Sequence, residues 1–67
     1  MEIRLNNETV TLVEESISLT RLLEVKKYTF RLRIVKVNGR LIERDNYDSE
    51  MVRDGDEVQV VYLMSGG

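Results

Sequence analysis

Alternation of apolar and polar residues predicts that the chain begins with a β-hairpin. Met1, Ile3 and Leu5 alternate with polar residues, a period of two that is typical of a half-buried strand. Two asparagines follow at 6–7, and asparagine tolerates the positive φ that tight hairpin turns need. The β-branched, alternating run 9–13 is expected to pair back as the second strand.

A short helix is predicted from Leu19 to Lys27. Ser18 is a suitable N-cap residue, and Leu19, Leu22 and Leu23 recur at helical spacing on one face. The two lysines at the end of this segment suit the negative C-terminal end of the helix dipole. We therefore expect the leucine face to pack on a sheet.

The strand predicted over residues 30–37 changes the phase of its alternation. Apolar residues up to Ile34 share one face, whereas Val35 and Val37 take the other. Either a bulge shifts the phase, or the strand is covered on both sides near its end. Asn38-Gly39 then gives a strong hairpin signal leading into a strand at 40–42.

The last third of the chain is expected to end in a strand from Val58 to Met64. The stretch 43–50 is polar and irregular, with Tyr47 as an anchor into the core, and residues 51–52 return to the interior. Asp54-Gly55 predicts a turn before the final strand. The resulting order, β-β-α-β-β-β, predicts an α+β fold with one mixed sheet and one helix on one of its faces.

Composition bounds the chemistry of the chain. Its 67 residues predict one domain, 1–67, and they include no cysteine and no histidine. Disulfides, thiolate or imidazole metal sites, and the usual base and nucleophile of hydrolases are therefore excluded. The acidic residues between 45 and 56 do not match the spacing of a calcium loop, so no metal site is expected. No apolar run is long enough for a membrane helix, and the N-terminus lacks the basic-then-apolar layout of a signal peptide, so a cytoplasmic location and no membrane partner are expected.

Charge is distributed unevenly along a chain of net charge −2. Residues 21–44 hold eight of the ten basic side chains. This pattern is consistent with two solvated faces of opposite sign, or with a bipolar surface that orients the domain on a charged partner. Nucleic acid is not an expected partner, because the total is acidic and no aromatic-basic motif occurs.

The most informative feature is Gly66-Gly67, at the end of a predicted flexible tail, residues 65–67. Glycine has no Cβ, so such a tail can enter a narrow site with its carboxylate first. Apolar residues occupy both faces of the preceding strand near its end, with Val61 and Leu63 on the face opposite Val58. Either loops cover that second face, or it is a docking surface beside the tail. The expected partner-binding residues are Val61, Leu63, Met64 and Ser65.

In this order of turns and in its Gly-Gly end, the sequence resembles the ThiS/MoaD group of ubiquitin-like sulfur carriers. The similarity covers essentially the whole chain and includes Asn38-Gly39, Asp54-Gly55-Asp56 and Gly66-Gly67. Within the group it is more similar to ThiS, because Tyr47 follows the segment 38–44 in the ThiS style and the proline common before the MoaD tail is absent.

The resemblance implies a β-grasp fold and a carrier that is not itself an enzyme and binds no cofactor. A ThiF-like, E1-type enzyme would use ATP and magnesium to convert the Gly67 carboxylate to an acyl-adenylate. A sulfur donor, such as a cysteine desulfurase system, would then give a thiocarboxylate for a ThiG-like thiazole synthase in thiamin biosynthesis.

Three alternatives stay open at the level of the sequence. A MoaD-like carrier would deliver sulfur to molybdopterin, and a ubiquitin-like modifier would be conjugated to target lysines through Gly67. A plain β-grasp interaction domain would have glycines at its end with no chemical role.

Overall fold

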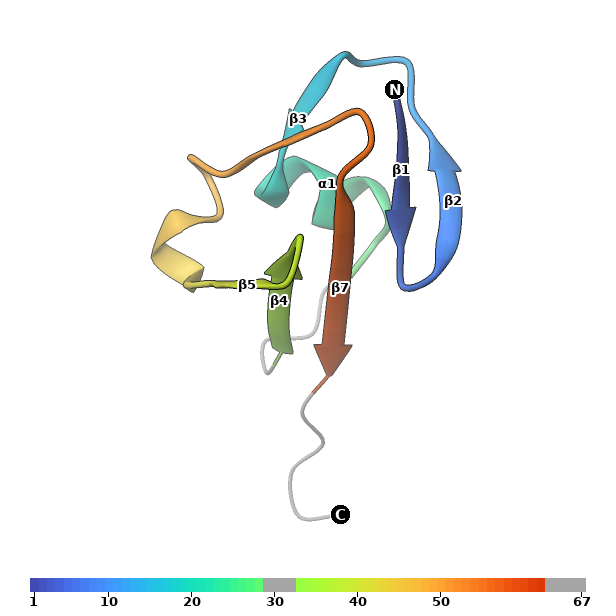
Figure 1. Cartoon of the computed structure of the whole chain (residues 1–67). Helices are drawn as coiled ribbons and strands as arrows, with labels where there is room; N and C mark the ends of the chain where they lie inside the picture. Colours follow the sequence, from blue (N-terminus) through green and yellow to red (C-terminus); the bar gives the residue numbers. More distant parts are fainter. Residues whose placement is uncertain (29–32, 63–67) are drawn as a thin grey trace.

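The computed structural model describes residues 1–28 and 33–62. One mixed sheet has the strand order β2-β1-β7-β4-β5, and its strands are labelled in Figure 1. Two other strands form a separate pair, β3-β6. The elements are β1 (Glu2–Leu5), β2 (Glu8–Thr11), β3 (Ser16–Ser18), α1 (Leu19–Val25), β4 (Arg33–Val37), β5 (Arg40–Ile42), the 3-10 turn η1 (Arg44–Asn46), β6 (Met51–Arg53) and β7 (Glu57–Tyr62).

Strand β7 lies at the centre of the larger sheet, between the two hairpins. It runs parallel to β1, with Leu5 opposite Val58, and antiparallel to β4, with Val35 opposite Val60. A helix crossing one face of a sheet made from two hairpins and a central last strand is the β-grasp arrangement. The expected α+β fold is confirmed.

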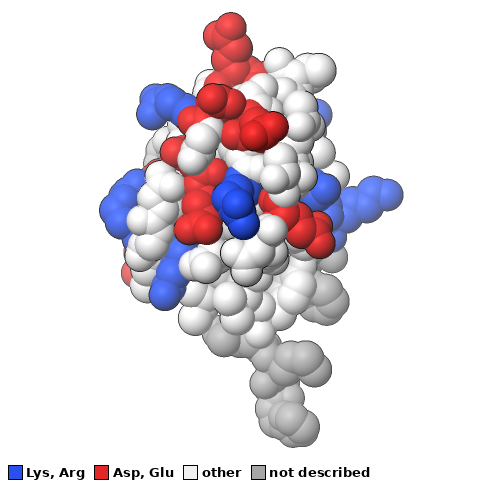
Figure 2. Space-filling view, turned by 45° about the vertical axis from the view of Figure 1, so that its right-hand side comes forward, with Lys and Arg blue, Asp and Glu red and all other residues white. Residues whose placement is uncertain are grey.

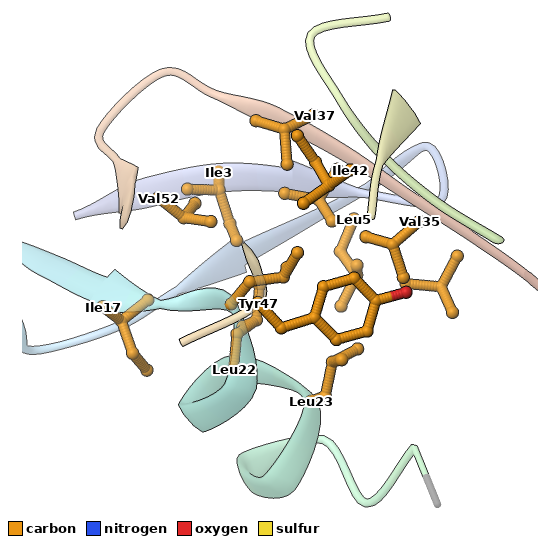
Figure 3. Packing of buried hydrophobic residues seen from close by; sticks show 13 residues of the cluster. Ile3, Leu5, Ile17, Leu22, Leu23, Val35, Val37, Ile42, Tyr47 and Val52 are labelled. Atoms are coloured by element: carbon orange, nitrogen blue, oxygen red, sulfur yellow. The ribbon is translucent and has the colours of Figure 1, made fainter. Parts of the chain in front are cut away.

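The hydrophobic core lies between α1 and one face of the sheet (Figure 3). The three leucines of the helix and the inward residues of each strand of the larger sheet except β2 are buried there. The ring of Tyr47 lies between the helix and the sheet and is also buried, so its predicted anchoring role is confirmed. The buried set is Ile3, Leu5, Ile17, Leu19, Leu22, Leu23, Val35, Val37, Ile42, Tyr47, Val52, Val58 and Val60.

Both predicted hairpin turns are present and have the same form. Asn6 and Asn7 have φ of 51° and 69°, and Asn38 and Gly39 have φ of 52° and 82°. Two consecutive positive φ values define a type I′ turn, whose twist matches that of the flanking strands.

The start of α1 is as predicted. The side chain of Ser18 accepts a hydrogen bond from the backbone N–H of Arg21 at 3.1 Å. Carbonyls of the 43–50 segment accept from the backbone N–H groups of Leu19 and Thr20. The first turn of the helix therefore has partners for N–H groups that a helix cannot satisfy internally.

The helix ends at Val25, two residues before the predicted end. Lys27 adopts a left-handed backbone with φ of 61°, and its N–H donates to the Glu24 carbonyl. The N–H of Tyr28 donates to the Leu23 carbonyl at 2.8 Å. These two bonds form a Schellman motif, in which the left-handed residue is usually glycine. Because a lysine takes this role, the sequence contains no visible stop signal.

Three further predictions needed correction. Residues 16–18 form β3, which pairs with β6 and was not predicted. Met51 was expected in the interior, but it flanks buried Val52 on β6, points outward and is 37% exposed. The second strand of the first hairpin was predicted over residues 9–13, but it ends at Thr11, two residues earlier than predicted. Val13 is 98% exposed.

The phase change in the third predicted strand is not a bulge between residues 33 and 37. Pairing of β4 with β7 is uninterrupted from Arg33 opposite Tyr62 to Val37 opposite Val58. Val35 and Val37 are buried, while Ile34 on the other face is half-buried, so apolar residues occupy both faces here. The predicted residues 30–32 lie outside the described part of the chain.

The end of α1 provides a test of this fold. Replacing Lys27 by glycine removes the cost of a left-handed backbone for a residue with a Cβ, and should stabilise the protein by about 1 kcal/mol. The adjacent Lys26→Gly is the matched control, because Lys26 has φ of −87° and the charge change is the same. It should destabilise the fold by about 0.5 to 1 kcal/mol, since glycine loses more chain entropy. Urea denaturation measures both; a stabilising Lys26→Gly or a destabilising Lys27→Gly would contradict the assignment.

Candidate functional site

Of the predicted partner-binding residues, the structure describes Val61. Leu63, Met64, Ser65, Gly66 and Gly67 lie outside the described residues. Strand β7 leads from the core to them, so the geometry of its last residues defines the described part of the site (Figure 1).

The two faces of β7 differ in what they contact. Val58 and Val60 are buried in the core, and Tyr62 on the same face is half-buried against it. Its ring meets that of Tyr28 edge to face, with centroids 5.9 Å apart and an interplanar angle of 76°. Val61 projects from the opposite face and is 54% exposed. The predicted alternation of this strand is confirmed up to Tyr62.

Val61 belongs to an apolar group on the sheet face that α1 does not cover. Ile34 of β4 lies directly opposite it, and Leu41 of β5 lies one diagonal step from Ile34. Leu41 is largely exposed and Ile34 half-buried. We call Ile34, Leu41 and Val61 the open-face patch. Lys36 of β4 lies on the same face, opposite Gln59 of β7 and opposite Leu41 of β5, so a charged residue interrupts the patch.

The other half of the same sheet face is polar. The residues of β1, β2 and the start of β7 that share this face are Glu2, Arg4, Thr9, Thr11 and Glu57. The apolar residues are thus concentrated on β4, β5 and the last part of β7. Docking of a partner protein on this part of the face would bury apolar surface at the end of β7.

Strand β7 is held by two asparagine side chains, one from each hairpin turn. Asn6 Oδ1 accepts from the Val60 N–H at 2.8 Å, and Asn6 Nδ2 donates to the Val60 carbonyl at 3.2 Å. Asn38 Oδ1 accepts from the Glu57 N–H at 2.9 Å, and its Nδ2 donates to Asp56 at 3.1 Å. Each turn therefore fixes one end of the strand.

The Asp54-Gly55-Asp56 segment has a structural role as the predicted turn. Asp54 Oδ1 accepts from the Glu2 N–H at 2.7 Å, and Asp56 Oδ2 accepts from the Arg53 N–H at 2.9 Å. Gly55, with φ of 85°, donates its N–H to the Glu2 carbonyl. Within residues 1–28 and 33–62, no three acidic groups are arranged so that they could hold a metal ion.

Some of the basic side chains from the 21–44 stretch pair with acids. Arg21 lies 3.5 Å from Glu24 and Arg40 lies 3.2 Å from Glu50. Acidic and basic side chains also lie beside one another on the face shown in Figure 2. Exposed pairs of this kind contribute about 0 to 1 kcal/mol each. Their main effect here is to reduce the local excess of positive charge.

In the described part of the chain, α1 spans seven residues, and no helix has the length and apolar character needed to cross a membrane.

Comparison with known protein families gives the family of this chain. The ThiS family matches residues 3–67. The chain belongs to the ThiS family. The resemblance to ubiquitin-like sulfur carriers, and the preference for ThiS within that group, are therefore confirmed.

Solved structures of the same family are similar over the whole chain. The crystal structure of the thiamine biosynthesis protein ThiS from Geobacter metallireducens has a TM-score of 0.90 and 35% sequence identity, with 100% of both chains covered. A solution structure of a thiamine biosynthesis protein from the same organism gives 0.81 and 34%, covering 100% of this chain and 88% of the other. No curated protein matched the sequence.

Sequence reasoning missed three of the residues described above. Ile34 and Leu41 join Val61 only because β4 lies between β7 and β5, and this lateral order has no local signal. Asn6 was recognised as a turn residue, but its side-chain bonds to Val60 join residues from opposite ends of the chain.

The two faces of β7 can be tested by placing the same charge on each. Val61→Asp should lower the free energy of unfolding by about 1 kcal/mol, the span of strand propensities, because the carboxylate stays in water. Val60→Asp is the matched control: it buries an unpaired charge at a position 6% exposed and should cost at least about 3 kcal/mol. Equal losses in thermal or urea denaturation would show that Val61 is a core position.

Proposed function

We propose that this protein is a sulfur carrier in thiamine biosynthesis and that the carboxylate of Gly67 is the group that carries the sulfur. The observation that supports this most directly is the family match over residues 3–67, which includes Gly66-Gly67. The similar proteins of known structure from Geobacter are thiamine biosynthesis proteins.

The proposed chemistry follows from the poor reactivity of a carboxylate. Its oxygen is a poor leaving group, so the carboxylate of Gly67 first attacks the α-phosphorus of ATP on a ThiF-like enzyme, and pyrophosphate leaves. The terminal sulfur of a donor persulfide, supplied by a cysteine desulfurase system, then attacks the acyl carbon and AMP leaves. A thiol of the donor system next attacks the donor-side sulfur of this acyl disulfide, so that the thiocarboxylate is released and the two thiols are oxidised to a disulfide. The resulting thiocarboxylate is the sulfur source for a ThiG-like thiazole synthase. ATP and magnesium belong to the activating partner.

In this proposal the chain is a co-substrate that partner enzymes bind and modify. The sequence contains neither histidine nor cysteine, so its own side chains offer no usual base or nucleophile. Gly66 and Gly67 give the 65–67 tail a narrow cross-section for entry into a partner's active site. Residues 1–67 act as one domain in the cytoplasm, with the fold holding the tail.

The partner enzymes bind beside the tail. The open-face patch supplies exposed apolar surface on the last part of β7, which a partner would bury together with Leu63, Met64 and Ser65. Binding there would present Gly67 to the active site of the partner.

The proposed function is tested by intact mass spectrometry of the full chain. Incubation with the cognate ThiF-like enzyme, ATP, magnesium and a sulfur source should raise the mass by the difference between one sulfur and one oxygen atom. Deleting Gly67, or adding one residue after it, should abolish this shift and leave the circular dichroism spectrum unchanged. Covalent ladders with other proteins would indicate a modifier instead, transfer of the sulfur to molybdopterin would indicate the MoaD branch, and no product of either kind would refute activation.

The docking surface is tested by a pair of charge substitutions on one sheet face. Val61→Asp should raise the KM of the ThiF-like enzyme for the carrier by about tenfold or more, as expected for a charge buried in an apolar contact. Thr9→Asp places the same charge on the polar half of that face and should leave KM within about twofold, as for exposed positions outside a contact. If both variants behave alike, the open-face patch is not the docking surface.

A further inference from the structure

Where β1 ends, the side chain of Asn6 continues the hydrogen bonding to the backbone of β7. In the described residues, β1 pairs with β7 at Arg4 and Leu5, opposite Glu57 and Val58. The backbone N–H of Asn6 adds a bond to the Val58 carbonyl at 2.9 Å. Beyond that point the Asn6 amide alone satisfies both backbone groups of Val60, which two successive bonding residues of a longer parallel strand would otherwise do.

The geometry at Asn6 requires two properties of its side chain. The backbone turns away from β7 with φ of 51°, a left-handed conformation that asparagine adopts more readily than most residues. The amide carries an acceptor and a donor on one carbon, and these match the N–H and the carbonyl of Val60. Glycine would keep the turn without the bonds, and aspartate would lose the donor.

These bonds act on the part of β7 that leads to the tail. On the other side of the strand, β4 pairs with the same segment, with Ile34 opposite Val61. The segment around Val60 is thus bonded to the Asn6 amide on one side and paired with β4 on the other. It lies two residues before Tyr62, where β7 ends. A strand that is hydrogen-bonded on both sides keeps one orientation at its end, whereas a strand bonded on one side opens locally more easily.

We propose that Asn6 is a positioning residue for activation of Gly67. Its amide fixes the direction in which the chain leaves the sheet, so that the open-face patch and the tail reach the partner together. This role rests on the proposed function and specifies how the carrier presents its end.

The expected kinetic effect of losing the clamp is on binding. If the end of β7 samples several directions, only a fraction of molecules has the competent one, and the apparent affinity falls by that fraction. Once the tail is bound, the reacting carboxylate and the partner's catalytic groups are unchanged. KM for the carrier should therefore rise while kcat stays the same.

The chain contains a matched control for this effect. Asn38 also occupies the first central position of a type I′ turn, with φ of 52°, and also makes two side-chain hydrogen bonds, one of them to the β7 backbone. Its bond to β7 is at Glu57, the opposite end of the strand from the tail. Asn6→Gly and Asn38→Gly each keep the left-handed turn and remove two hydrogen bonds, so both should lower Tm, Asn6→Gly by more because its bonds are partly buried and those of Asn38 are exposed.

The experiment compares the full-length variants in steady-state pyrophosphate release by the cognate ThiF-like enzyme with ATP, magnesium and the sulfur source, which displaces AMP and lets the enzyme turn over. Asn6→Gly should raise the KM for the carrier at least about fivefold, corresponding to a competent fraction of about one fifth or less, with kcat unchanged. Asn38→Gly should stay within about twofold of the original protein in both constants, because its competent fraction is unaffected. Amide exchange by NMR should show loss of protection at the Val60 N–H in Asn6→Gly and not in Asn38→Gly.

The outcomes separate the clamp from the proposed function. Equal KM values for the two variants, a fall in kcat alone, or an unchanged Val60 exchange rate would overturn the positioning role while leaving the carrier function standing. If the original protein supports no pyrophosphate release, the proposed function fails, and with it the role of Asn6 in activation.

Discussion

The pairing of β7 with both hairpins is the interaction on which the rest of the structure depends. Its contact with β1 joins residues from opposite ends of the chain, with Arg4 opposite Glu57. Closing so long a loop costs chain entropy before any contact forms. Burial of Val58 and Val60 between the sheet and α1 offsets that cost, and the Asp54-Gly55-Asp56 turn fixes the start of β7 against Glu2. In residues 1–28 and 33–62, the two hairpins share no strand pairing other than through β7.

Asn6 and Asn38 have the same two roles, one near each end of β7. Each must reverse the chain in a type I′ turn, and each has a side chain that can bond to a neighbouring backbone. Glycine would satisfy the first demand alone. Asn6 and Asn38 satisfy both, so a residue type that sequence reasoning assigns to turn formation also determines how the central strand is held.

The sequence predicted those parts of the fold whose signals are local. Alternation and turn residues predicted the five strands of the larger sheet. Ser18 as N-cap and the leucine face of the helix predicted where α1 starts, and alternation predicted that Val61 points away from the core. The β3-β6 pair was missed because each strand has three residues and its partner is far along the chain. The helix end was missed because Lys27 takes a glycine's conformation, held by bonds to Glu24 and Leu23 carbonyls. The open-face patch depends on which strands are neighbours, and that order is a property of the whole sheet.

The alternation of β7 lets one strand meet two opposing demands. Under the proposed function, β7 has to be held firmly in the sheet and also has to leave apolar surface at its end uncovered for a partner. Because successive side chains point to opposite faces, Val60 can be buried and Val61 exposed at adjacent positions. Among the described residues no other element packs on the open face, and under the proposed function this is the surface that a partner covers.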